Sequence, residues 1–259
     1  MKYMFQMVSL LIITVVIALN VSAGQERIVP IGWVLEAEAH LARIDSYTAI
    51  FHKQERVKGD LRDEEVAFFK FKKPFKIYMK WIKDPGKGRE VLYADGWNQN
   101  QIKVHESWMK AGFTVDLDAK GFLAMRGSRH PITDSGLENF LRIMRRDLEN
   151  GMRSGELTYR ELGEETIYGS RSQKVEYIVP RDKTKGYYCY RSIINFDVKT
   201  KMPIRVKIYD WNDALVEDYG YENLKLDAGL TDADFDPKNP EYGFSPSDPK
   251  NPPLKNPLQ

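Results

Sequence analysis

The sequence predicts an α+β fold, in which helices lie on one side of a large, curved antiparallel sheet. Many short segments alternate apolar and polar residues, and tight turns such as residues 211–213 join them, which is typical of an antiparallel meander. Two segments, 31–44 and 136–150, instead have apolar residues at helical spacing. The expected order is therefore helix, strands, helix, strands, which indicates helices packed against a sheet.

Residues 75–81 form the most regular of the expected strands. One face carries Phe75, Ile77, Met79 and Trp81, and the other carries Lys76, Tyr78 and Lys80. Because successive strand side chains face opposite sides, we expect the first face to be dry and the second to be wet. Residues 66–71 are nearly continuously apolar, so that strand is expected to lie between two layers.

Each helical segment carries one apolar stripe. The stripe of segment 31–44 consists of Trp33, Ala37, Leu41 and Ile44, and that of segment 136–150 consists of Leu137, Phe140, Leu141, Met144 and Leu148. We expect the first helix to press Trp33 onto the sheet. Ser135 and Glu138 have the spacing of a capping box at the start of the second helix, and Gly151 is expected to end it.

Residues 107–131 are the least regular part of the chain. They carry large apolar side chains among glycines, namely Trp108, Phe113, Phe122, Leu123 and Met125. Such a segment is a candidate lid or mouth loop for a cavity. A further pair of strands is the alternative interpretation.

The chain divides into three parts. Residues 1–23 have the pattern of a signal peptide: Lys2, an apolar run over residues 8–19 and a small-residue cleavage site that ends at Ala23. Residues 24–236 are expected to form one domain in the periplasm, with an uncleaved N-terminal anchor as the alternative. Residues 237–259 contain seven of the 13 prolines, so we expect an extended or disordered tail.

Composition and motifs exclude several classes of function. The formal net charge of +2 argues against a nucleic-acid partner, which requires a clustered basic face. The four histidines are not at metal-ligand spacing, and the lone Cys189 is expected within a strand, as a buried apolar residue. We therefore expect no catalytic residues, no metal and no cofactor, in a protein that is a monomer and not an enzyme.

Several runs resemble one family. Residues 47–51, Tyr-Thr-Ala-Ile-Phe, are followed by Gln54, a turn and residues 69–76, Phe-Lys-Phe-Lys-Lys-Pro-Phe-Lys. These runs resemble the first strands of the periplasmic outer-membrane lipoprotein carriers, the LolA-like proteins. Residues 91–96 and the segments 203–209 and 219–235 are similar to later parts of these proteins. The resemblance covers most of residues 31–236 and points to an uncharacterised subgroup of the superfamily.

The resemblance implies an incomplete β-barrel that is open on one side, with helices capping its concave apolar face. Such carriers take lipoproteins from an inner-membrane transporter and deliver them to an outer-membrane receptor. In the carriers an arginine precedes the proline at the place of Lys73-Pro74 and holds the lid helices shut. Lys73 is accordingly the candidate lid latch here, although lysine lacks the planar fork of arginine.

Together these observations predict a periplasmic carrier or binder of lipid or acylated protein, with acyl chains in an apolar cavity. The candidate cavity residues are Phe69, Phe71, Phe75, Ile77, Met79 and Trp81, and the candidate helical cap is Trp33, Leu137, Phe140, Leu141 and Met144. Ordinary core packing is the alternative for each of them. One alternative function is an envelope regulator or scaffold that binds another envelope protein by its sheet edge or proline-rich tail. The other is a hydrolase, which would need polar groups converging in the cavity.

Overall fold

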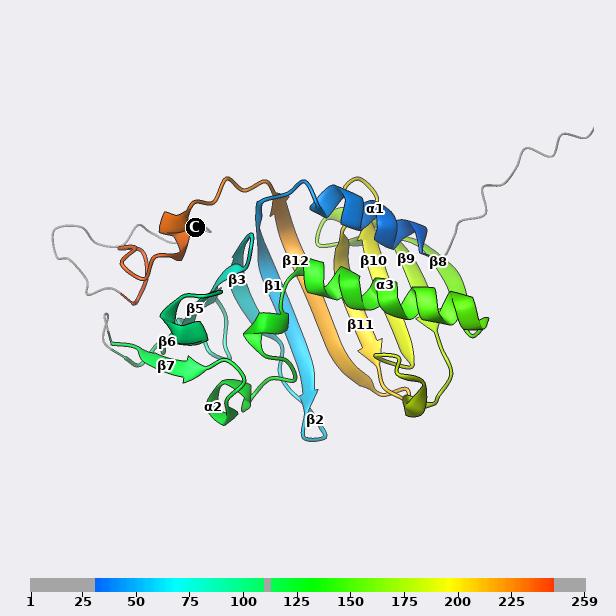
Figure 1. Ribbon diagram of the computed structural model, residues 1–259, viewed down its shortest axis with the longest axis horizontal. Coiled ribbons are helices and arrows are strands. Elements are labelled where there is room, and N and C mark those ends of the chain that lie inside the picture. Colours follow the sequence, from blue (N-terminus) through cyan, green and yellow to red (C-terminus); the bar gives the residue numbers. More distant parts are fainter. Residues whose placement is uncertain (1–30, 110–112, 245–259) are drawn as a thin grey trace, which may run out of the picture.

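The structure is a computed structural model that describes residues 31–109 and 113–244 (Figure 1). The predicted signal peptide and its cleavage site lie outside the described residues, as does the part of the predicted tail after residue 244. The α+β prediction is confirmed: the described residues form a curved antiparallel sheet of 12 strands, which is not closed into a barrel, and three α-helices. Within the described ranges, no helix combines the length and apolarity that a bilayer-crossing helix needs.

The strands follow the order β7-β6-β5-β4-β3-β1-β12-β11-β10-β9-β8, and β2 pairs with β1. Their bounds are β1 Ser46–Val57, β2 Asp60–Leu61, β3 Glu65–Lys72, β4 Lys76–Trp81, β5 Glu90–Ala94, β6 Gln101–His105, β7 Val115–Asp118, β8 Thr158–Ile167, β9 Ser170–Ile178, β10 Arg191–Asp197, β11 Pro203–Tyr209 and β12 Leu215–Leu226. The first and last strands are therefore neighbours in the middle of the sheet, while β7 and β8 form its two edges.

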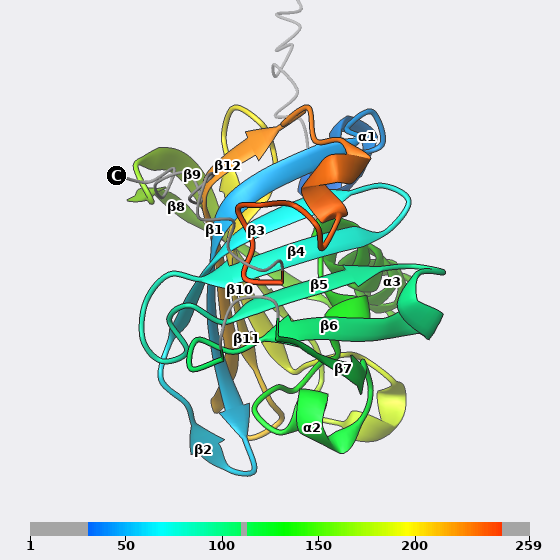
Figure 2. The same ribbon diagram turned by 90° about the vertical axis from the view of Figure 1, so that its left-hand side faces the viewer.

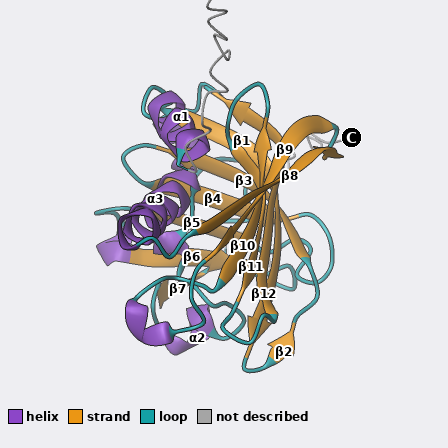
Figure 3. Ribbon diagram, turned by 90° about the vertical axis from the view of Figure 1, so that its right-hand side faces the viewer, coloured by secondary structure: helices purple, strands orange, loops and turns teal. Residues whose placement is uncertain are grey.

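Helices α1 (Gly32–Leu41) and α3 (Leu137–Ser154) lie side by side across the concave face of the sheet (Figures 1 and 3). The sheet and these two helices share one apolar core. As expected, Trp33 of α1 packs on the sheet, where its ring stacks on Phe196 of β10 at a centroid distance of 5.7 Å. The short helix α2 (Phe122–Met125) lies near the β7 end of the sheet (Figure 2).

The start of α3 differs from the capping box that the sequence predicts. The N-cap residue is Gly136, at φ 105°, and Ser135 does not cap the helix. The hydroxyl oxygen of Tyr47, on β1, instead accepts a hydrogen bond from the backbone N–H of Leu137 at 2.9 Å. A Cβ atom on residue 136 would lie 3.2 Å from that oxygen, so both the backbone conformation and the close approach require glycine. A residue of the sheet thus fixes where α3 begins.

The end of α3 also differs from the prediction. Gly151 lies inside the helix, and the left-handed residue that ends it is Gly155, at φ 69°. A Cβ atom on residue 151 would lie 3.1 Å from Cβ of Leu157. Gly151 therefore allows the chain to pack closely as it turns back toward β8.

The first residues of the proline-rich segment are packed, in contrast to the expected extended or disordered tail. Residues 230–244, here called the C-terminal segment, cover the outer face of β3, β4 and β5. The ring of Tyr242 stacks on Tyr78 at a centroid distance of 4.0 Å, and Phe244 is buried beside them. Tyr78 is therefore buried, although the alternation of residues 75–81 placed it on a wet face. The expectation that residues 66–71 lie between two layers is confirmed.

The described part of residues 107–131 contains one strand, where the alternative interpretation expects two. It includes the edge strand β7 and the helix α2. Trp108 and Phe122 are 78% and 73% exposed. Large apolar side chains in this segment thus remain in contact with solvent.

Candidate functional site

A cavity of about 300 Å³ lies between the concave face of the sheet and α3. Its wall is mostly aromatic and aliphatic. The apolar lining comprises Phe51, Phe69, Met79, Trp81, Val91, Ile102, Ala119, Ala124, Ile132, Phe140, Ile143, Met144, Leu148, Leu157, Val179, Ile194, Val206 and Ile208. These residues come from β1, β3–β6 and β10–β11, from helices α2 and α3, and from the segments that join them. The cavity therefore extends under α3 on both sides of the β1–β12 pair.

The structure places half of the six candidate cavity residues on the cavity wall. Phe69, Met79 and Trp81 line the cavity, whereas Phe71, Phe75 and Ile77 lie in the adjoining core. The register of β3 and β4 explains the division. Phe69 pairs with Met79 on the cavity wall, and Phe71 pairs with Ile77 closer to the start of α3. There the ring of Phe71 stacks on that of Tyr47 at a centroid distance of 4.9 Å, which leaves no free space.

The candidate helical cap divides in the same way. Phe140 and Met144 line the cavity, whereas Trp33, Leu137 and Leu141 are packed in the core. No residue of α1 is among the lining residues. Helix α3 therefore provides most of the helical wall of the cavity, α2 adds Ala124, and α1 packs beside α3.

The candidate latch, Lys73, contacts α1. Its Nζ donates hydrogen bonds to the carbonyl oxygens of Leu41 and Ala42, at 2.8 and 3.3 Å. These carbonyls end the helix, where a cation interacts favourably with the helix dipole. Lys73 thus fixes the C-terminal end of α1 to the sheet.

The sequence-based prediction missed a polar cluster at the cavity. On the face that lines the cavity, the side chains of β1 and of β12 change from apolar to polar toward one end of each strand. Their register pairs Phe51 with Tyr221, Lys53 with Tyr219 and Glu55 with Glu217. Both glutamates are buried, at 4% and 1% exposure. Like charges directly opposite one another destabilise a sheet, so this pair needs cations and hydrogen-bond donors nearby.

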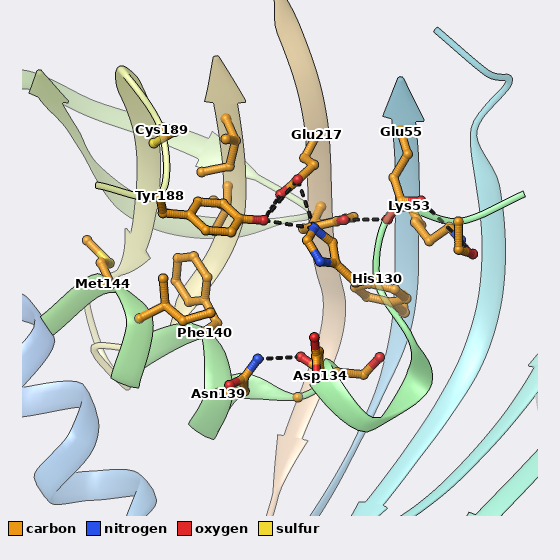
Figure 4. A pocket seen from close by; sticks show the side chains of 18 of the residues that line it. Lys53, Glu55, His130, Asp134, Asn139, Phe140, Met144, Tyr188, Cys189 and Glu217 are labelled. Atoms are coloured by element: carbon orange, nitrogen blue, oxygen red, sulfur yellow. Dashed lines mark hydrogen bonds and ion pairs between the residues drawn. The ribbon is translucent and has the colours of Figure 1, made fainter. Parts of the chain in front are cut away.

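Glu217 receives four donor contacts. Its Oε1 accepts from Nε of Arg129 at 2.8 Å and from Nε2 of His130 at 3.0 Å. The hydroxyl of Tyr188 lies 2.9 Å from each of its carboxylate oxygens. Figure 4 shows the side chains of Glu217, His130 and Tyr188 pointing toward one another.

Glu55 is satisfied by a second set of donors. Its Oε1 accepts from the hydroxyl of Tyr219 at 2.5 Å, and its Oε2 accepts from the backbone N–H of Arg129 at 2.8 Å. Nζ of Lys53 lies 3.6 Å from Oε2. The two buried carboxylates therefore hold residues 129–130, between α2 and α3, against the middle of the sheet.

The cluster shifts the pKa values of its members. Burial raises the pKa of Glu217, but the hydrogen bond and charge of His130 and the hydrogen bonds of Arg129 and Tyr188 outweigh burial, so the pKa lies below its ordinary value. Burial lowers the pKa of His130, but the hydrogen bond and charge of Glu217 outweigh it, so that pKa lies above 6.5. Both shifts favour an ion pair of imidazolium and carboxylate.

The cluster lacks an activated nucleophile among the described residues. Cys189 lines the cavity from the coil before β10, rather than from within a strand as expected. Burial, followed by the charges of Asp147 and Glu217, raises the pKa of its thiol. Burial and Glu217 likewise raise the pKa of Tyr188. Since the deprotonated form is the nucleophile, these groups are suited to hydrogen bonding rather than to covalent attack.

The described residues contain no group of three or more His, Cys, Asp or Glu side chains that could hold a metal ion. The cavity thus offers an apolar wall, one charge-balanced polar cluster and a ring nitrogen, Nδ1 of His130, that has no hydrogen-bond partner among those residues.

Comparison with known families identifies the chain by sequence. Residues 44–244 match DUF1571, a family of proteins of unknown function. The chain belongs to this family. The match begins just before β1 and ends at Phe244, so it includes the whole sheet and the C-terminal segment. A search of the curated proteins gave no match.

Several solved structures are similar to this chain. Lipoprotein LppX of Mycobacterium tuberculosis is 10% identical, with a TM-score of 0.47 over 78% of this chain and 97% of its own. A LolA superfamily protein of Nitrosomonas europaea is 12% identical, with a TM-score of 0.37 over 81% of this chain and 98% of its own. The MucA/MucB complex of Pseudomonas aeruginosa is 15% identical, with a TM-score of 0.41 over 80% of this chain and 60% of that chain.

Proposed function

We propose that this protein is a periplasmic carrier or binder of lipid or acylated protein, which holds acyl chains in its cavity without covalent chemistry. The observation that carries the proposal is the cavity of about 300 Å³ with a mostly apolar wall beneath α3. The signal-peptide pattern of residues 1–23 supports export.

The driving force for uptake is the removal of hydrocarbon from water. Each methylene that enters an apolar cavity contributes about 0.8 kcal/mol. Phe69, Met79 and Phe140 present rings and a thioether to the space, and side chains of this kind pack well around a flexible chain. A chain of ten methylenes would gain roughly 8 kcal/mol before the cost of ordering it.

A second function is favoured by a different observation, the two edges of the sheet. Among the described strands, β8 pairs with β9 alone and β7 with β6 alone, and β8 is exposed along most of its length. Unpaired strand edges accept added strands from other chains. A regulator or scaffold that binds another envelope protein through such an edge would need no open cavity.

Native mass spectrometry tests the proposed function. The full-length chain is expressed in a bacterium with two membranes, and the processed protein is purified from the periplasm without detergent. We expect a population that carries a lipid-sized adduct, which organic extraction and mass spectrometry identify. Ala124→Trp should fill the cavity and abolish the adduct, because Ala124 lines it.

The matched control is Ala233→Trp, since Ala233 is exposed on the 3₁₀ turn Asp232–Phe235, outside the cavity. This variant should keep the adduct. Bare polypeptide in every preparation, together with failure of the purified protein to take up added fatty acid, would refute the carrier function.

A further inference from the structure

His130 presents one ring nitrogen to the cavity and uses the other for the polar cluster. Its Nε2 lies 3.0 Å from Oε1 of Glu217 and 2.8 Å from the hydroxyl of Tyr188. Its Nδ1 has no hydrogen-bond partner among the described residues. Figure 4 shows the ring projecting into the space that Phe140 and Asn139 border.

We propose that the cavity binds one single-chain amphiphile, whose hydrocarbon lies along Phe140 and Met144 and whose carbonyl oxygen accepts a hydrogen bond from Nδ1 of His130. This inference rests on the proposed function and specifies its ligand. The shared chemistry is a carbonyl at the head of one acyl chain, which a free fatty acid, an ester or an amide would supply.

The volume of the cavity limits the ligand to one chain. An apolar cavity of about 150 Å³ accommodates benzene, which has six carbons. The cavity here is about 300 Å³, so by proportion it holds on the order of a dozen carbons. A lipid with two or three long chains would exceed this space.

The exposed fractions of the lining side chains indicate which end of the ligand lies nearer to solvent. The side chain of His130 is 31% exposed, whereas Phe69 and Met79, deeper in the cavity, are 1% and 7% exposed. A polar head at His130 would keep partial contact with water, while the hydrocarbon would lie in the dry part. This is the arrangement that an amphiphile requires.

The chemistry of the cluster favours an acceptor as the head group. The hydrogen bond and the charge of Glu217 favour the imidazolium form of His130, and in that form Nδ1 carries a proton and donates. The oxygens of Glu55 and Glu217 already accept donors from the protein. Asp134 also lines the cavity but is exposed, so water and salt screen its attraction for a cationic head.

Isothermal titration of the delipidated protein with a matched series of twelve-carbon ligands tests the inference. Dodecanoate, methyl dodecanoate and dodecanamide carry the carbonyl, and dodecylamine does not. We expect the three carbonyl compounds to bind about ten-fold more tightly than dodecylamine, which corresponds to one hydrogen bond from a charged donor. The ester and amide, compared with the acid, distinguish an acylated conjugate from a free fatty acid.

A variant and its control locate the head group. His130→Gln should remove the preference for carbonyl compounds, whereas His40→Gln should retain it, since His40 bonds to the backbone of Thr200 and lies outside the cavity. The comparison of ligands on the unaltered protein does not depend on whether either variant folds.

The outcomes separate the inference from the proposed function. Absence of binding by all four ligands would refute the carrier function and the inference together. Equal affinity for dodecylamine and dodecanoate, or uptake of a phospholipid with two dodecanoyl chains as tight as that of dodecanoate, would overturn the inference alone.

Discussion

The two faces of β3, β4 and β5 make the most instructive comparison in this molecule. Both faces carry large aromatic side chains: Phe69 and Trp81 on the inner face, Phe68 and Tyr78 on the outer face. On the outer face the chain's own C-terminal segment fills the space. On the inner face α3 covers the sheet but leaves a cavity. An apolar sheet face therefore does not by itself identify a binding surface. Whether the face can bind a ligand depends on whether the segment that covers it leaves free space.

The largest expected effect concerns the outer face. Tyr242→Ala should lower the free energy of unfolding by about 3–5 kcal/mol, because it leaves a void over Tyr78. Tyr242→Phe should cost only about 1–2 kcal/mol, since it keeps the ring and loses the hydrogen bonds that the hydroxyl accepts from Lys70 and donates to the carbonyl oxygen of Asp234. Urea denaturation measures both. Equal stability of Tyr242→Ala and the unaltered protein would show that the outer face is open.

A charge placed on the inner face should affect ligand binding more than folding. Met79→Asp should weaken binding of dodecanoate at least about ten-fold, because the new carboxylate lies on the cavity wall. The substitution should lower the free energy of unfolding by only about 1–2 kcal/mol, since water can enter the cavity and solvate the charge.

The same substitution at a packed methionine is the control. Met202 is fully buried and does not line the cavity, so Met202→Asp should cost about 3–5 kcal/mol. If thermal and urea unfolding find Met79→Asp as destabilised as Met202→Asp, then Met79 belongs to closed core and the two faces do not differ.

The smallest expected effect is the pH dependence of the inner polar cluster. The folded-state pKa of His130 lies above 6.5, so its contribution is complete below about 6.5 and is lost as the pH rises through the folded-state pKa. The pKa of Glu217 lies below 4.5, so its contribution is complete above about 4.5 and is lost as the pH falls through its folded-state pKa.

Urea unfolding measured from acid through neutral to alkaline pH should therefore show both losses, that of Glu217 on the acid side and that of His130 on the alkaline side. His130→Gln should abolish the loss on the alkaline side. On the outer face Asp234 also has a lowered pKa, because hydrogen bonds from Thr231 and Lys70 outweigh burial, and it contributes only to the acid side. A loss on the alkaline side that persists in His130→Gln would place its origin elsewhere.

Sequence periodicity predicted the α+β class, helices α1 and α3 and most strands, because each of these elements has its own local spacing of apolar residues. It did not predict β7 or α2. It identified which side chains of residues 75–81 share a face, but not which of them border free space. That distinction separates Met79 from Ile77 and depends on where α3 begins, which Tyr47 and Gly136 fix. Contacts between residues 47 and 137 leave no trace in the local pattern.

The polar cluster was missed for a related reason. The spacing of Phe51, Lys53 and Glu55, and of Glu217, Tyr219 and Tyr221, shows that both strands change from apolar to polar along one face. That signal was present in the sequence. The pairing that brings Glu55 opposite Glu217, and the supply of His130 from a third segment, follow only from the register.

The pairing of β1 with β12 has a consequence for how the molecule is made. Tyr47 lies opposite Leu226, and Glu55 lies opposite Glu217, so the central seam of hydrogen bonds joins residues more than 160 positions apart. Until residues 217–226 reach β1, one edge of that strand has no partner. Contacts this distant in sequence form slowly and leave strand edges prone to aggregation. An exported chain would therefore benefit from a chaperone that shields the β1 edge until the residues of β12 arrive.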